Sequence, residues 1–174
     1  RLFLSALASA ALLVLTGCPP QPPALRPPPA VMPTYREVAQ HYNARIGGID
    51  QLYIATWMIN EQATAELIRM IDAGTIEDCA VLTGLYFRQR AASCWADLNA
   101  ALPKRGHRIR AADNHAKILL IHTGDNWLTV EGSSNLTQNT RIEQNVITND
   151  RELYEFHQSW LESLLPKRSE VATV

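Results

Sequence analysis

The chain has 174 residues, of which 47% are hydrophobic and 19% charged, and 16 Lys and Arg against 17 Asp and Glu give a net charge of -1. This length suits one domain whose core needs neither a disulfide nor a structural metal. The near-neutral charge excludes the molecule-wide basic field of a protein that coats nucleic acid non-specifically, although it does not exclude a local basic patch.

The first 18 residues have the pattern of an export signal. An apolar run from Leu2 to Leu15 follows Arg1 and is shorter than the roughly 20 residues of a membrane-spanning helix. The run ends in Leu-Thr-Gly-Cys, which resembles the lipobox of bacterial lipoproteins. The resemblance implies that Cys18 is lipidated and that the protein is exported, membrane-anchored and facing the periplasm or the cell exterior. Simple secretion and an incorrectly assigned start are the alternatives.

Eight of the ten prolines lie in residues 19–33. Proline lacks an N–H and fixes φ, so this segment predicts an extended linker rather than a helix or an inner strand. An unstructured tail without a spacer role is the alternative. We therefore divide the chain into a signal segment (1–18), a linker (19–33), a folded domain (34–165) and a flexible tail (166–174).

Helical and strand patterns alternate along the domain. The expected elements are helices at 34–48, 61–73, 89–102 and from about 150, and strands at 51–59, 79–82, 107–111, 117–122, 127–130 and 144–148. Asn60 can cap the second helix, and Asn149 followed by Glu152 resembles a capping box for the last helix. The alternation predicts an α/β sandwich.

Two cysteines and three tryptophans of the domain have apolar surroundings. Cys79 and Cys94 can pair in an oxidising compartment or remain as two buried thiols, and the sequence leaves both open. Trp57, Trp95 and Trp160 are expected to pack in the core.

A histidine and a lysine share one predicted strand. His115 and Lys117 are two residues apart, and residues at this spacing point to the same face of a strand. A histidine can act as a nucleophile or carry a proton, and a lysine supplies a fixed positive charge. The pair therefore predicts a site for an anionic substrate.

A polar segment follows 15 residues after the lysine. Gly132 permits close approach of the backbone, and Ser133, Ser134 and Asn135 offer hydroxyl and amide groups that suit phosphate oxygens. Glu143 can orient an imidazole and fix its tautomer. Together with the histidine and lysine, these groups meet the needs of phosphoryl transfer.

The combined pattern, His-x-Lys, then Gly-Ser-x-Asn, then Glu, resembles the phospholipase D superfamily over residues 113–149. The resemblance implies a phospholipase D-like α/β sandwich with a mixed sheet and helices on both faces. It also implies that His115 attacks phosphorus to form a phosphohistidine, and that Glu143 supports the imidazole. Lys117, Ser133 and Asn135 would hold the phosphate, and no metal or other cofactor is implied.

The chain has one His-x-Lys motif, whereas the family's mechanism uses two. The resemblance therefore implies a homodimer in which both motifs meet at the two-fold axis, as in the one-motif endonucleases of the superfamily. One position departs from the family pattern: His122 stands where an Asp usually follows the lysine by five residues.

The substrate class remains open between nucleic acid and phospholipid. Residues 88–110 contain six Lys or Arg and one acid, which suits a polyanion such as DNA or RNA. The same charge suits anionic lipid headgroups near a membrane anchor, or is an ordinary solvated helix face. We expect a phosphodiester hydrolase with nucleic acid preferred; a phospholipase or phosphatidyl transferase and a non-catalytic binding protein are the alternatives.

Overall fold

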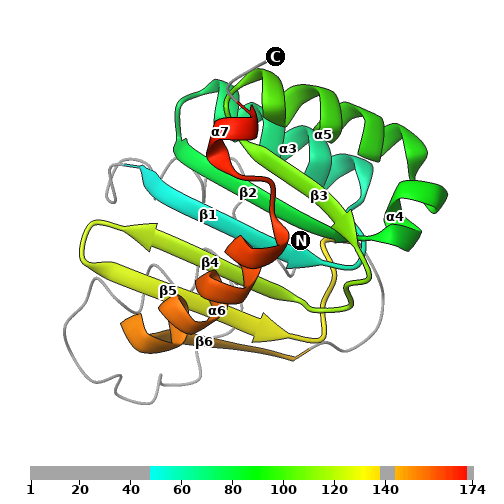
Figure 1. Cartoon of the computed structure of the whole chain (residues 1–174). Helices are drawn as coiled ribbons and strands as arrows, with labels where there is room; N and C mark the ends of the chain where they lie inside the picture. Colours follow the sequence, from blue (N-terminus) through cyan, green and yellow to red (C-terminus); the bar gives the residue numbers. More distant parts are fainter. Residues whose placement is uncertain (1–47, 138–143, 172–174) are drawn as a thin grey trace, which may run out of the picture.

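A single mixed sheet forms the centre of the computed structural model, which describes residues 48–137 and 144–171. The strand order is β3-β2-β1-β4-β5-β6 (Figure 1). The strands are β1 (Ile49–Thr56), β2 (Ile76–Gly84), β3 (Arg108–Ala112), β4 (Ile118–Thr123), β5 (Asn126–Gly132) and β6 (Asn145–Asn149). The first three are parallel, and each later strand is antiparallel to its neighbour. The predicted mixed sheet is confirmed.

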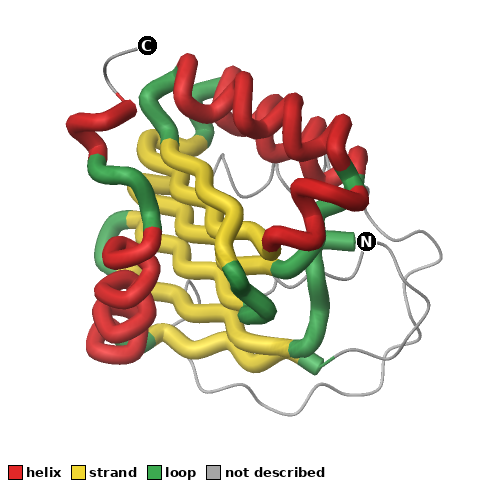
Figure 2. Tube along the Cα trace, turned by 45° about the vertical axis from the view of Figure 1, so that its right-hand side comes forward, coloured by secondary structure: helices red, strands yellow, loops and turns green. Residues whose placement is uncertain are grey.

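Helices cover both faces of this sheet, as predicted (Figure 2). On one face pack α3 (Glu61–Asp72) and α5 (Ala92–Lys104), with the short α4 (Leu85–Arg90) beside them; α6 (Arg151–Leu164) covers the other face. The segment predicted as a flexible tail contains a further short helix, α7 (Arg168–Val171). None of the helices in residues 48–137 and 144–171 combines the length and the apolar composition of a membrane-spanning helix.

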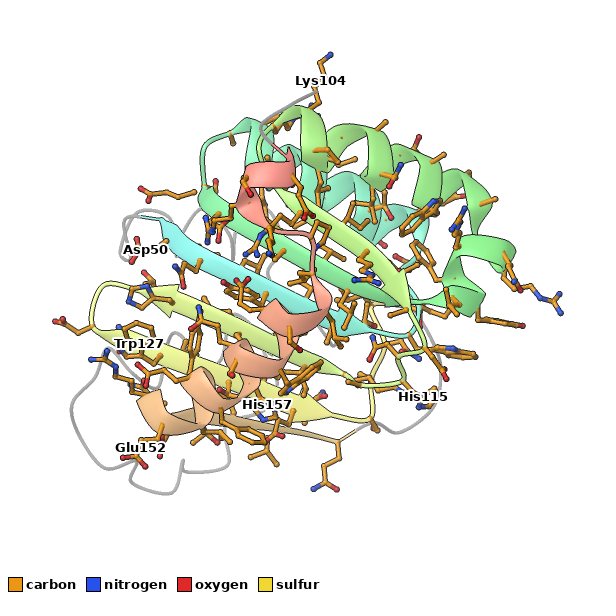
Figure 3. The ribbon with its side chains drawn as sticks, viewed as in Figure 1. Asp50, Lys104, His115, Trp127, Glu152 and His157 are labelled. Atoms are coloured by element: carbon orange, nitrogen blue, oxygen red, sulfur yellow. The ribbon has the colours of Figure 1, made fainter. Side chains whose placement is uncertain are left out.

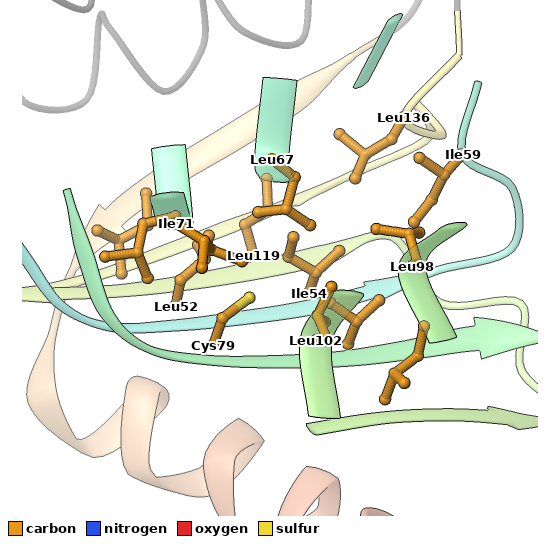
Figure 4. Close-up of a cluster of buried hydrophobic side chains, with 14 of the residues drawn as sticks. Leu52, Ile54, Ile59, Leu67, Ile71, Cys79, Leu98, Leu102, Leu119 and Leu136 are labelled. Carbon is orange, nitrogen blue, oxygen red and sulfur yellow. The ribbon is translucent and has the colours of Figure 1, made fainter. Parts of the chain in front are cut away.

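Alternate residues of the central strand enter two separate apolar clusters, as the two-residue period of a strand requires. Leu52 and Ile54 of β1 pack with helices α3 and α5 (Figure 4), whereas Tyr53 and Ala55 pack with α6. Full burial of each large apolar side chain contributes about 1.5–3 kcal/mol. The sheet is therefore fixed from both faces, and its strand ends can carry polar loops.

The helix boundaries correct two details of the sequence-based expectation. The predicted helix at 89–102 is two helices, because Ala91 has non-helical dihedrals (φ -124°, ψ 56°) and turns the chain between them. The last helix is capped by Asp150, whose side chain accepts from the Leu153 N–H at 3.0 Å, rather than by Asn149. The predicted Asn60 cap is confirmed by its 2.8 Å bond from the Ala63 N–H.

Cys79 and Cys94 are both buried free thiols, so they do not pair. Burial raises the pKa of the Cys79 thiol, which keeps it protonated and unreactive. Cys18, the linker and nearly all of the predicted helix at 34–48 lie outside the described residues.

Candidate active site

The loop between β3 and β4 carries the predicted nucleophile. His115 lies in this loop and is exposed, and Lys117 immediately precedes the first residue of β4. Neither residue lies within a strand, which corrects the expectation that strand geometry aligns their side chains. Figure 3 shows His115 at the end of the sheet where β1 and β2 finish.

Asn114 holds this loop against two neighbouring strands. Its side-chain N–H group donates to the backbone oxygens of Thr56 and Leu82, each at 3.2 Å, and its Oδ1 accepts from the Ala116 N–H at 2.9 Å. Thr56 ends β1, and Leu82 is two residues from the end of β2. A single amide side chain thus fixes the backbone on both sides of His115.

Lys117 reaches back to the histidine. Its ammonium donates to the His115 carbonyl oxygen at 2.6 Å and lies 2.9 Å from Nδ1 and 3.5 Å from Nε2 of the imidazole. The positive charge of half-buried Lys117 and the exposed His115 ring therefore lie side by side in the loop. The contacts of the Lys117 side chain with the His115 carbonyl oxygen and ring, not a common strand face, bring the two groups together.

The polar segment after β5 lies directly beside Lys117. The Gly132 N–H donates to the Lys117 carbonyl oxygen at 3.2 Å, and exposed Ser133 exchanges two bonds with Gln144 at 3.0 and 3.1 Å. A Cβ on Gly132 would overlap the Asn145 amide and come 2.5 Å from the Gln144 oxygen. Glycine is required there because the start of β6 passes so close.

Asn135 is linked to the same strand end as the histidine loop. Its Oδ1 accepts at 3.4 Å from the Thr56 hydroxyl, which is shared with the Met58 carbonyl oxygen at 3.1 Å. The next residue pairs with the chain after β1 through a 2.8 Å bond from the Asn60 N–H to the Leu136 oxygen. Thr56 is 2% exposed. It therefore joins the His115 loop, through its carbonyl, to the Asn135 segment, through its hydroxyl.

Two other predicted residues are placed differently. Ser134 is 6% exposed, and its hydroxyl accepts from the Asn145 amide at 3.3 Å, so its position favours a structural contact over phosphate binding. Glu143, the predicted support of the imidazole, lies outside the described residues.

Sequence reasoning placed Trp57 in the core and missed its position beside the histidine. The Trp57 and His115 ring centroids are 5.2 Å apart, with the rings tilted by 49°. Trp57 directly follows β1, and Tyr86, which stacks on it at 4.9 Å and 13°, lies two residues after β2 ends. The position of these two residues in the sequence could have predicted their contact, because residues that follow the carboxyl ends of neighbouring parallel strands gather at one edge of the sheet.

His122, which replaces the family's usual Asp, lies at the other end of β4. Its ring stacks on Trp127 at 3.8 Å, and Nδ1 is 3.5 Å from the Asp50 carboxylate. The same Asp50 carboxylate accepts from the Gly124 N–H in the turn after β4 at 3.0 Å. The residue that departs from the family pattern, His122, therefore lies at the end of β4 opposite the His115 loop. Asp50 of the adjacent strand β1 supplies a carboxylate beside it.

The basic segment at 88–110 does not form one continuous surface. Arg108 is 1% exposed and bonds to Glu162 at 2.5 and 2.7 Å, Arg105 pairs with Asp72, and Lys104 lies across the molecule from His115 (Figure 3). The hydrogen bond from Arg108 lowers the pKa of the Glu162 carboxyl. Arg110 donates to the Leu164 oxygen at 2.8 Å, Arg88 lies over Trp95, and Arg90 lies over Tyr86 of the aromatic pair at the site.

Within residues 48–137 and 144–171, no group of three or more His, Cys, Asp or Glu side chains is placed to hold a metal ion. The described groups at the site are an imidazole, an ammonium, hydroxyl and amide groups. They suit a phosphate, since nitrogen and hydroxyl donors can hold its oxygens while the imidazole supplies a nucleophile.

No family model matches the chain, and no curated protein sequence matches it. Among solved structures, the chain is similar to Nuc, a phospholipase D family member from Salmonella typhimurium, with a TM-score of 0.53 and 19% identity. The similarity covers 74% of this chain and 86% of that chain. The chain therefore has the fold of this phospholipase D family member, which confirms the fold that the motif predicted.

Proposed function

We propose that this protein is a phosphodiester hydrolase of the phospholipase D type that acts on nucleic acid without a metal. The observation that carries the proposal is the meeting of His115, Lys117 and the Gly132–Asn135 segment at the end of β1. An exposed imidazole next to an ammonium and to hydroxyl and amide groups is suited to attack on a bound phosphate.

In the proposed first step, a ring nitrogen of His115 forms a bond to phosphorus as the bond from phosphorus to the leaving oxygen breaks. That oxygen takes a proton from the partner subunit's His115. In the second step water attacks phosphorus, gives its proton to the partner subunit's His115, and releases the first imidazole. Lys117, Ser133 and Asn135 would stabilise the charge on the phosphate oxygens, and Glu143 would orient the imidazole.

A dimer belongs to this proposal because one chain supplies one His-x-Lys motif. Two exposed His115 loops facing each other across a two-fold axis would provide both the nucleophile and the general acid. We also propose that the protein is exported and anchored through lipidated Cys18, with residues 19–33 as the spacer between the membrane and the domain.

Phospholipid is the second candidate substrate. The observation in its favour is that Leu85 and Tyr86, which are 48% and 39% exposed, lie beside the site. Exposed apolar groups next to an anionic site suit a lipid surface, and a lipid anchor at Cys18 would hold the domain near one. A binding protein without catalysis is the third candidate.

The test is incubation of the full chain with plasmid DNA and, separately, with phosphatidylglycerol vesicles, each in EDTA. We expect DNA cleavage in EDTA, its loss in His115→Ala, and its retention in the control His122→Ala. Headgroup release without DNA cleavage would select the phospholipase, and no turnover by a verified dimer would select the binding protein. Full activity of a strict monomer in sedimentation would contradict the two-fold site, and loss of activity in EDTA would contradict the metal-free mechanism.

A further inference from the structure

Aromatic rings form a row that begins at the proposed nucleophile. Trp57 lies 5.2 Å from the His115 ring, and Tyr86 stacks on Trp57 at 4.9 Å with an interplanar angle of 13°. The residues come from different strand ends, since Trp57 follows β1 and Tyr86 follows β2. The row therefore leads away from the reacting group on a surface built by two elements.

The structure holds Trp57 in this position closely. A Cβ on Gly84 would lie 2.5 Å from Trp57 Cδ1 and 3.1 Å from the Asn114 carbonyl oxygen. Gly84 is thus the residue over which the indole lies, and it also borders the backbone next to His115. A ring fixed this near the site is a preformed contact for whatever part of the substrate flanks the phosphate.

Positive charge accompanies the rings. The Arg90 guanidinium lies over the Tyr86 ring at 5.2 Å, and the Arg88 guanidinium lies over Trp95 at 5.9 Å. Both arginines are exposed, and neither has an ion pair with any residue in 48–137 or 144–171. Unlike Arg105 and Arg108, they are available to neutralise an external anion.

Exposed aromatic rings beside guanidinium groups are the pair of contacts by which proteins bind single-stranded nucleic acid. A base can lie on a side-chain ring only when it is not stacked in a duplex, whereas the guanidinium pairs with the phosphate of the same strand. A phospholipid headgroup offers the phosphate but no planar ring to stack.

We propose that Trp57, Tyr86 and Arg90 form a subsite beside the scissile phosphate that makes single-stranded nucleic acid the preferred substrate. In this subsite an unpaired base takes the place of the Arg90 guanidinium over the Tyr86 ring, and that guanidinium moves to a phosphate of the same strand. The inference rests on the proposed function for the position of the phosphate. Beyond the proposed function, the inference says that the nucleic acid is single-stranded and names the side chains that select it.

The test measures binding, on the full chain carrying His115→Ala so that cleavage does not interfere. The probes are a fluorescent oligothymidylate, a hairpin duplex and phosphatidylglycerol vesicles. We expect Tyr86→Ala to weaken oligothymidylate binding about tenfold or more, while duplex binding changes less than about twofold. Tyr86→Phe, which keeps the ring, should bind like the parent, and Arg90→Gln should lower the salt slope of oligothymidylate binding by about one.

Two variants separate stacking from general damage. Tyr86→Leu keeps bulk but loses the aromatic face, so it should weaken binding as Tyr86→Ala does. Phe156→Ala removes an aromatic ring that is 66% exposed on α6, on the other face of the sheet, and should leave binding unchanged. Normal unfolding midpoints for the Tyr86 variants would show that any loss is local.

The inference is wrong if Tyr86→Ala leaves oligothymidylate affinity unchanged, or if it weakens duplex and single-strand binding equally. Vesicle binding that depends on Tyr86, with no such dependence for oligothymidylate, would also overturn it and select a lipid surface. If the chain with His115 intact cleaves DNA but Tyr86 is irrelevant, only this inference fails. If Tyr86-dependent binding persists in a chain that cleaves nothing, the subsite stands and the proposed hydrolysis fails.

Discussion

The two ends of β4 each place a histidine beside a tryptophan, but their surroundings differ. At one end His115 is exposed in a loop, tilted by 49° to Trp57 and next to the ammonium of Lys117. At the other end His122 is stacked on Trp127 at 23°, within 3.5 Å of the Asp50 carboxylate. Tyr154 of α6 packs edge-on against both rings of this second pair.

The comparison shows that a histidine next to an aromatic ring does not identify a site by itself. His122 has a carboxylate neighbour, Asp50, and is enclosed by two aromatic rings, so its ring contacts other groups of the protein. His115 has a cation and donor groups as neighbours and a solvent-facing ring, which is the arrangement that an anionic substrate requires. Matched changes at the two ends can test this distinction.

The largest effect is expected from removing each histidine in turn. His115→Ala should lower the DNA cleavage rate at least about a thousandfold, because the proposed nucleophile is lost, and should change the free energy of unfolding by less than about 0.5 kcal/mol. His122→Ala should keep the cleavage rate within about threefold and lower the free energy of unfolding by about 1 kcal/mol through lost stacking. Initial rates and urea unfolding of both variants measure this; equal rate losses would contradict the comparison.

Asparagines at the two ends provide the next test. Asn114→Ala removes the three bonds that fix the His115 loop, and we expect kcat to fall about a hundredfold with little change in KM, since the nucleophile is misplaced rather than removed. Asn126→Ala removes two bonds at the other end, one donated to the Thr123 oxygen at 3.4 Å and one accepted from the Asn149 amide at 3.3 Å, and should leave kcat within about twofold. Steady-state kinetics decide between them. A KM effect alone in Asn114→Ala would show that the loop binds substrate without positioning the nucleophile.

Glycines at the two ends should give smaller effects of different kinds. Gly84→Ala adds a Cβ 2.5 Å from Trp57 Cδ1, so we expect the indole to shift, activity to fall about tenfold and stability to fall by about 1–3 kcal/mol. Gly124 has φ +54° with open space around its Cα, so Gly124→Ala should cost about 1 kcal/mol and leave activity unchanged. Paired rate and unfolding measurements separate the two. Unchanged activity in Gly84→Ala would remove Trp57 from the site.

The smallest effect, a small loss of stability, is expected from changing Asp50, the carboxylate beside His122. Asp50→Asn keeps an oxygen that can accept from the Gly124 N–H but removes the negative charge that strengthens this bond, so stability should fall by less than about 1 kcal/mol. The loss should shrink at high salt, where exposed charges are screened. Urea unfolding at low and high salt measures it. A loss of activity in this variant would show that the His122 end contributes to the site after all.

Local signals predicted most of the secondary structure. The strands were found from β-forming residues, and the Asn60 cap from its position before an amphipathic helix, because both depend on neighbouring residues. The break at Ala91, where the backbone leaves helical dihedrals although its N–H still donates to the Phe87 oxygen, has no proline or glycine to signal it in the sequence.

The site was predicted as a set of residues but not as a geometry. The order of the motifs along the chain named His115, Lys117 and the 132–135 segment as candidates, and the structure brings them to one end of the sheet. The roles of Asn114 and Trp57 depend on contacts with Thr56, Leu82 and Gly84 on other strands, which no local pattern records. Arg108 was counted as surface charge for the same reason: its partner Glu162 lies 54 residues away.

The bond between Thr56 and Asn135 spans 79 residues of sequence. Both halves of the sheet must be in place before this bond can form, and closing so long a loop is slow because its entropy is lost before the contact is gained. An incompletely folded chain therefore holds His115 without the Asn135 segment beside it. Under the proposed function, a newly made chain would therefore gain activity only after the two halves of the sheet have paired.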